Sequence, residues 1–217
     1  MMFQALTTGP IGTELQMIAA IVGLVIGVVL HEAAHGYVAF RLGDPTAYYL
    51  GRVTLNPLKH IDLWGTILVP LILIISRAGF VFGWAKPVPV NYYNLRYGNY
   101  GPVMVALAGP GTNFLLVVVF GLLARFSPPT TALPFLFVTI ALINAVLMFF
   151  NLIPIPPLDG SKVLYLILHH YHRSDIVEFL ERYSFYIIIV LLLFGAGLVS
   201  RFVIGPALAL TRLFAGF

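Results

Sequence analysis

The stretch MIAAIVGLVIGVVLHEAAHGYVAF, residues 17–40, decides the fold class and contains the strongest indication of function. As a helix it is long enough to cross the roughly 30 Å hydrocarbon core of a bilayer. Within it, His31, Glu32 and His35 form the pattern HExxH, which places ionisable side chains where lipid makes them costly. Residues four apart share a helix face, so both imidazoles can bind one metal ion while Glu32 projects beside them. This is the arrangement of zinc hydrolases.

The composition of the whole chain indicates a protein that crosses a membrane several times. Of its 217 residues, 60% are hydrophobic and only 9% are charged, and the mean hydropathy is +0.97, far from soluble globular domains. The 12 Lys and Arg exceed the 8 Asp and Glu, but no basic run indicates a nucleic-acid partner, and we interpret the excess as a topology signal. Cysteine is absent, so the candidate metal ligands are His, Asp and Glu.

Long apolar stretches predict an all-α polytopic membrane protein with about five to six transmembrane helices. The stretches are 17–40, 62–83, 101–124, 133–153 and 184–203. Gly205-Pro206 then interrupts the pattern, which predicts a short terminal helix over 207–217 at the interface. Because no long polar linker or repeat occurs, residues 1–217 are predicted to form a single intramembrane domain.

The distribution of basic residues predicts the orientation of the helices. Residues 1–40 contain no Lys or Arg, whereas basic residues gather in 41–61 and in 160–183. The positive-inside rule therefore places both of these regions on the cytoplasmic side. If 17–40, 101–124 and 133–153 each cross once, the region 41–100 must begin and end on the same side.

This requirement leaves two interpretations of the region between the first and third long apolar stretches. Either 62–83 is re-entrant, or the segment near 81–100 returns through the protein in extended form. The prolines in FGWAKPVPVN, residues 82–91, disfavour helix. Non-helical chain at membrane depth is tolerated where it is buried in protein or lines a wet cavity. We therefore expect a hydrated pocket, and we expect 82–91 to offer an edge to an unwound substrate.

A second carboxylate in an apolar context is Asp159, which follows three prolines in the run NLIPIPPLDG, residues 151–160. An ionisable group within the membrane indicates a functional site, and it needs a partner that compensates its charge. The partner we predict is a metal ion held by His31 and His35. Two His and one Asp leave a fourth tetrahedral position for water, and Glu32 is then placed to move a proton from that water to a leaving amine. The predicted reaction is peptide hydrolysis.

At these motifs the chain resembles the site-2 protease family of intramembrane zinc metalloproteases. The matching motifs are HEAAH at 31–35, AGPGTN at 108–113 and NLIPIPPLDG at 151–160. The segment GWAKPVPV at 83–90 is similar to one in the short branch of the family, which lacks PDZ and CBS domains.

The resemblance implies a role for each matching residue. One Zn²⁺ per chain would be bound by His31, His35 and Asp159, with Glu32 as general base and acid. Asn151 would help to hold the substrate or its oxyanion. The resemblance places Asn113 and Gly109 on the helix beside the HEAAH helix; we take Asn113 as a further substrate-binding candidate, and Gly109 as a packing residue.

These features predict an intramembrane zinc endopeptidase that cuts within or near transmembrane segments of membrane-protein substrates, in regulated intramembrane proteolysis. Its partners would be a substrate helix and the lipid bilayer. The predicted location is a prokaryotic cell membrane, with the active site toward the cytoplasmic side.

Two alternatives remain open. One is a metal transporter that uses the His/Asp site, although the chain shows no repeated ligand set. The other is an inactive scaffold that binds helices, although this would need no general base.

Overall fold

The structure is a computed structural model that describes residues 10–76 and 83–216. Within these ranges every regular element is a helix, which confirms the predicted all-α polytopic fold. The longer helices are α2 (Pro10–Arg41), α5 (Tyr100–Phe126), α6 (Leu133–Asn151), α7 (Gly160–His170), α8 (Ser174–Phe194) and α10 (Gly205–Ala215). The shorter helical pieces are α3 (Thr46–Tyr49), η1 (Pro57–His60), η2 (Leu63–Leu68), α4 (Val69–Ile75), η3 (Tyr92–Asn94), α9 (Ala196–Val199) and η4 (Ser200–Ile204).

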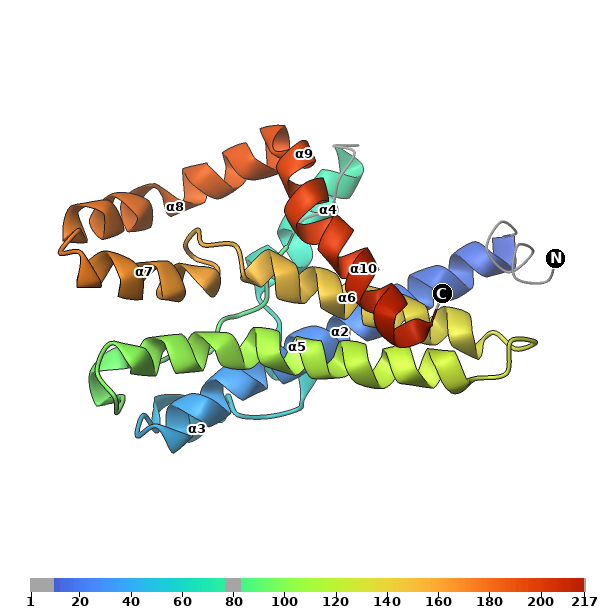
Figure 1. Cartoon of the computed structure of the whole chain (residues 1–217), viewed down its shortest axis with the longest axis horizontal. Helices are drawn as coiled ribbons and strands as arrows, with labels where there is room; N and C mark the ends of the chain where they lie inside the picture. The colour runs from blue at the N-terminus through green and yellow to red at the C-terminus, as the bar shows by residue number, and fades with distance from the viewer. Residues whose placement is uncertain (1–9, 77–82, 217) are drawn as a thin grey trace.

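Helices α2, α5 and α6 form the centre of the molecule, and each packs against the other two. In Figure 1 they run lengthwise, and α10 crosses α5 and α6. Helices α7 and α8 form a hairpin at the left of the view, whereas α10 ends at the right. Small residues allow the close approach of α2 to α6, because a Cβ added at Gly23 would lie 3.0 Å from the Cα of Ile140. Such contacts hold helices together where lipid offers no hydrophobic driving force.

Four helices among the described residues are long and apolar enough to cross a membrane. They are Thr13–Arg41, Tyr100–Phe126, Leu133–Asn151 and Ala196–Ala215. The first three confirm the stretches predicted near 17–40, 101–124 and 133–153.

The predicted fifth span over 184–203 is wrong in its position. The chain leaves the helical path at Gly195, and α9, η4 and α10 then continue as one apolar helix through Ala215. The predicted interruption at Gly205-Pro206 is also wrong, because the π-helix η4 ends at Ile204, α10 begins at Gly205, and both of these residues have helical backbone angles.

The region between α2 and α5 begins and ends at the same end of the bundle, as the parity of the crossings requires. The backbone N–H of Arg96 donates to the carbonyl of Leu42 over 2.9 Å. The apolar helix in this region covers only Leu63–Ile75, fewer than the roughly 20 residues that a crossing needs. Residues 83–91 follow in extended form, as predicted; the remainder of the predicted 62–83 and 82–91 segments, at 77–82, lies outside the described residues.

Two buried charged residues fix this extended segment to its surroundings. Asp44 accepts hydrogen bonds from the backbone of Asn91 over 2.7 Å and from the side chain of Asn94 over 3.2 Å. Burial opposes its ionisation, but these bonds and those from Thr46 together lower the pKa of Asp44. The Arg52 guanidinium donates to the carbonyls of Lys86 and Pro87. The segment therefore has a defined position beside α2.

Candidate active site

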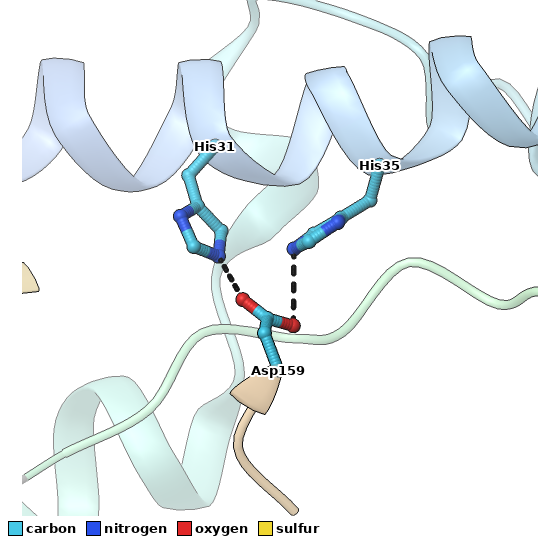
Figure 2. A group of neighbouring side chains, drawn as sticks. All are labelled: His31, His35 and Asp159. Atoms are coloured by element: carbon cyan, nitrogen blue, oxygen red, sulfur yellow. Dashed lines mark ion pairs between the residues drawn. The ribbon is translucent and has the colours of Figure 1, made fainter. Parts of the chain in front are cut away.

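The three predicted metal ligands converge on one point, although Asp159 lies far from the histidines in sequence (Figure 2). His31 and His35 lie on successive turns of α2, and Asp159 directly precedes α7. Nε2 of His31 lies 3.1 Å from Oδ2 of Asp159, and Nε2 of His35 lies 3.4 Å from Oδ1. Ligand atoms that share one zinc ion at bond lengths of about 2 Å lie about 3.3 Å apart. The spacing of these side chains therefore fits a single metal ion.

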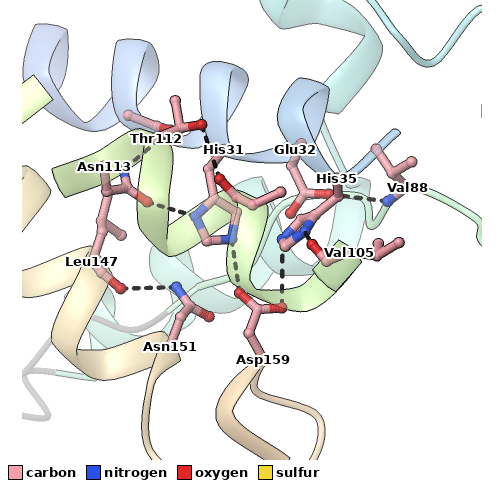
Figure 3. Close-up of polar contacts among 12 residues, drawn as sticks. His31, Glu32, His35, Val88, Val105, Thr112, Asn113, Leu147, Asn151 and Asp159 are labelled. Carbon is pink, nitrogen blue, oxygen red and sulfur yellow. Dashed lines mark hydrogen bonds and ion pairs between the residues drawn. The ribbon is translucent and has the colours of Figure 1, made fainter. Parts of the chain in front are cut away.

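The hydrogen bond that each imidazole makes through Nδ1 fixes its tautomer, and therefore fixes whether the Nε2 atom that faces Asp159 carries a lone pair. Nδ1 of His31 donates to Oδ1 of Asn113 over 2.5 Å, and Nδ1 of His35 donates to the carbonyl of Val105 over 2.7 Å (Figure 3). With the proton on Nδ1, each Nε2 is an acceptor directed at a carboxylate that is also an acceptor. Oδ2 of Asp159 is buried and has no hydrogen-bond donor. A cation between these three acceptors would satisfy all of them, so the donor set fits a divalent metal.

Glu32 lies beside this group without belonging to it. Its Oε2 accepts a hydrogen bond from the backbone N–H of Val88 over 3.0 Å (Figure 3). Glu32 and the three candidate ligands line a cavity of about 200 Å³, together with part of the extended segment. The carboxylate therefore faces a space that a water molecule can enter, as a general base requires.

The two asparagines predicted to bind substrate lie in different environments. Asn151, at the end of α6, donates to the carbonyl of Leu147 over 3.0 Å and lines the cavity, so its substrate role stays a prediction. Asn113 is 0% exposed, does not line the cavity and contacts His31 from behind. This position does not fit substrate binding, because Asn113 is fully buried and its side chain contacts the face of the cavity-lining His31 ring that carries Nδ1. It fits the support of a ligand instead.

Gly109 has a more specific role than the general helix packing that the sequence predicts. A Cβ added there would lie 2.5 Å from Nε2 of His31 and 2.5 Å from Nε2 of His35. The absence of a side chain on α5 thus leaves open the space in front of both ligand atoms. No spacing rule in the sequence marks this contact, because it depends on how α5 crosses α2.

Replacement of Gly109 by alanine is expected to abolish metal binding without unfolding the protein. The added methyl group would occupy the space that both imidazole nitrogens face, whereas the same change at Gly111 meets nothing within 4 Å. We expect the zinc content of purified Gly109→Ala to fall below a tenth of the wild-type value, and Gly111→Ala to keep it. Equal zinc in both variants would contradict the placement of the metal beside Gly109.

Lys162 is a cavity residue that is not among the site residues predicted from the sequence. It lines the cavity, and its ammonium lies 5.2 Å from the ring centre of Tyr92 and 4.8 Å from that of Tyr165. Burial lowers the pKa of Lys162, while Glu181 and Asp159 act in the opposite direction. The two rings hold a cation beside the carboxylate that precedes α7. Its signal in the sequence is its place three residues after Asp159.

Comparisons with known proteins agree with this geometry. The model of peptidase family M50 matches residues 128–195. The putative zinc metalloprotease YwhC of Bacillus subtilis is 38% identical over 183 residues, which cover 79% of this chain and 78% of that protein. The putative zinc metalloprotease Rip2 of Mycolicibacterium smegmatis is 31% identical over 179 residues, 81% of this chain and 67% of that protein. MJ0611 of Methanocaldococcus jannaschii, also a putative zinc metalloprotease, is 29% identical over 69% of this chain and 71% of that protein. No solved structure gives a significant match.

A bundle of membrane-length helices that encloses an HExxH motif and a distant aspartate defines a membrane metalloprotease. The chain belongs to peptidase family M50, the site-2 proteases. The zinc metalloprotease predicted from its motifs is thereby confirmed as its enzyme class.

Proposed function

We propose that this enzyme cleaves membrane-protein substrates within or near their transmembrane segments, in regulated intramembrane proteolysis, with one zinc ion held by His31, His35 and Asp159. The observation that carries the proposal is the meeting of three acceptor atoms inside a bundle of membrane-length helices. A site enclosed by such helices suits the cleavage of a peptide bond that lipid would otherwise shield.

The residues around the cavity supply the proton chemistry of peptide hydrolysis. A bound zinc ion would polarise the scissile carbonyl and the attacking water as a Lewis acid. Glu32 accepts a proton from that water as its oxygen bonds to the carbonyl carbon, and delivers the proton to the nitrogen as the C–N bond breaks. The N–H of Val88 holds the Glu32 carboxylate at 3.0 Å and so orients it toward the cavity. Asn151, on the cavity wall, is placed to hold the substrate or its oxyanion.

A helical substrate must unwind before its backbone can reach this site, because helical amides are internally bonded and shielded. The extended segment at 83–91 borders the cavity through Pro87, Val88 and Val90. We propose that the unwound substrate lies along this segment as an added strand. The bonds of Arg52 and Asp44 to the segment keep that edge in place.

We further propose that the site opens toward the cytoplasmic side of a prokaryotic cell membrane. Arg41 ends α2 six residues after His35. Arg52 donates to the carbonyls of Lys86 and Pro87, next to Val88, which holds Glu32. The positive-inside rule assigns such an end to the cytoplasm. The relatives described above come from bacteria and an archaeon.

Metal removal from the reconstituted enzyme tests the proposal. In liposomes that contain a single-span substrate protein, we expect chelation to reduce cleavage at least 100-fold, and one equivalent of zinc to restore it. The soluble domain of the same substrate, without its transmembrane segment, serves as the control and is expected to stay intact. Zinc uptake into the liposomes without cleavage would indicate a transporter. Binding of the substrate without cleavage at any zinc concentration would indicate a scaffold. Either result would contradict the proposal.

A further inference from the structure

Behind His31, two buried amides form a chain of hydrogen bonds that joins α2, α5 and α6. Asn144 and Asn113 are both 0% exposed. The amide nitrogen of Asn144 donates to the carbonyls of Ile140, over 2.9 Å, and Gly23, over 3.3 Å. Its oxygen accepts from Nδ2 of Asn113 over 2.9 Å, and Oδ1 of Asn113 accepts from Nδ1 of His31 over 2.5 Å. The chain thus ends on the imidazole of a candidate metal ligand.

The order of donors and acceptors along these hydrogen bonds is set first at Asn144, the amide that lies farther from the metal site. Backbone carbonyls only accept, so the nitrogen of Asn144 must face Ile140 and Gly23, and its oxygen must face Asn113. Asn113 must then turn its nitrogen to Asn144, which leaves its oxygen for His31. A flip of either amide would oppose two donors or two acceptors where no water reaches them. His31 is therefore left with one arrangement, in which Nδ1 carries the proton.

The second imidazole shows why His31 needs such a chain. His35 donates to the backbone carbonyl of Val105, which has no donor face. The partner of His31 is a side-chain amide, which offers a donor face as readily as an acceptor face. Two bonds from Nδ2 of Asn113 remove that ambiguity: a short one to Oδ1 of Asn144, over 2.9 Å, and a longer one to the carbonyl of Gly27, over 3.4 Å.

We propose that Asn144 is a positioning residue for zinc binding: as the nearer of the two acceptors for the Asn113 amide, it holds Asn113 in the orientation that fixes the tautomer of His31, so that Nε2 presents its lone pair to the metal. The inference rests on the proposed metal site. It assigns a function to a residue that touches neither the cavity nor any candidate ligand. Partners of this outer kind orient a metal-binding imidazole and raise its basicity.

Asparagine pairs also hold membrane helices together, and that purely structural role is the alternative. Asn144 is well placed for it, because a Cβ added at Gly27 of α2 would lie 2.5 Å from Oδ1 of Asn144. The two roles predict different effects. Loss of helix packing lowers the unfolding temperature alone, whereas loss of positioning weakens zinc binding and changes the protonation of the His31 ring.

Two substitutions of Asn144 separate these roles. In Asn144→Thr the hydroxyl can bond to the carbonyl four residues earlier, as Thr112, Thr139 and Thr211 do in this protein. Its oxygen is attached directly to Cβ, one bond nearer the backbone than Oδ1 of asparagine, so we expect it to fall short of the Asn113 amide. In Asn144→Asp the acceptor oxygen remains, and burial favours a neutral carboxyl whose O–H can replace the lost donor. Thr211→Val, at a buried position on α10, is the matched control for a lost buried polar group.

The measurements are the zinc dissociation constant of the purified protein, by competition with a chelator, and the ¹⁵N signals of the histidine rings without metal. We expect Asn144→Thr to bind zinc about 10–100-fold more weakly and to lose the Nδ1–H signature of His31. Asn144→Asp is expected to stay within about threefold of the wild type, and Thr211→Val to match it.

Wild-type zinc affinity and an unchanged His31 signature in Asn144→Thr would overturn the inference, as would equally weak binding in Asn144→Asp. If Asn144→Thr does not fold, Asn144→Leu, which fills the same space without polar atoms, gives the same comparison. A wild-type protein that binds no zinc would instead overturn the proposed function, so the two failures are distinguishable.

Discussion

Glu32→Gln is expected to abolish proteolysis while the enzyme keeps its full zinc content. Glutamine has nearly the same shape as glutamate and can still accept the hydrogen bond from Val88, but it cannot take a proton from water. A positioned general base contributes about 10²–10⁴-fold to the rate, so we expect the cleavage rate to fall by about 10³-fold or more. The measurements are initial cleavage rates in liposomes and the zinc content of the same preparations.

Glu14→Gln provides the matched control for this change. Glu14 lies on the same helix as Glu32, but it is exposed near the start of that helix. The Glu14→Gln enzyme is expected to cleave the substrate at the wild-type rate. Proteolysis by Glu32→Gln at that rate would reject Glu32 as the base, and loss of zinc from Glu32→Gln would make Glu32 a ligand.

The second large effect is expected for Asp159→Ala. This change removes the carboxylate that faces both Nε2 atoms, at 3.1 Å and 3.4 Å. Loss of an outer partner of a metal ligand costs about 10–100-fold in affinity, and we expect the loss of a direct ligand to exceed this range. The measurement is the zinc dissociation constant, with cleavage falling in parallel.

Asp175→Ala is the control for Asp159→Ala, because Asp175 pairs with Arg173 at the surface and lies outside the site. Exposed pairs of this kind contribute little to stability. The variant is expected to retain wild-type affinity. Wild-type zinc affinity in Asp159→Ala would remove Asp159 from the ligand set.

The candidate ligands could be predicted from the sequence because their charge conflicts with their surroundings. His31, Glu32 and His35 stand within an apolar helix, and Asp159 follows a proline break. A polar group in such a context needs a partner, and the ligands are the partners of one another. Asn144 carries the same signal, since it is a polar residue in the apolar stretch at 133–153, but its role depends on a contact with Asn113 that no spacing reveals.

The features that the sequence analysis missed depend on backbone geometry rather than on composition. Residues 184–203 contain a single charged residue, Arg201, so hydropathy does not register the break at Gly195. Gly205-Pro206 predicts the end of a helix, but in the structure the pair follows the π-helix η4 and the helical backbone continues through it. Gly109 leaves room in front of two imidazoles because it has no side chain and because α5 crosses α2 at that point.

Zinc-edge X-ray absorption of the purified protein, together with its metal content, tests the central claim most directly. We predict one zinc ion per chain, coordinated by two imidazole nitrogens and by oxygen at about 2.0–2.2 Å. In His31→Ala the residual zinc should show no more than one imidazole. A zinc shell without imidazole, or a folded protein that takes up no zinc when zinc is supplied, would contradict the account.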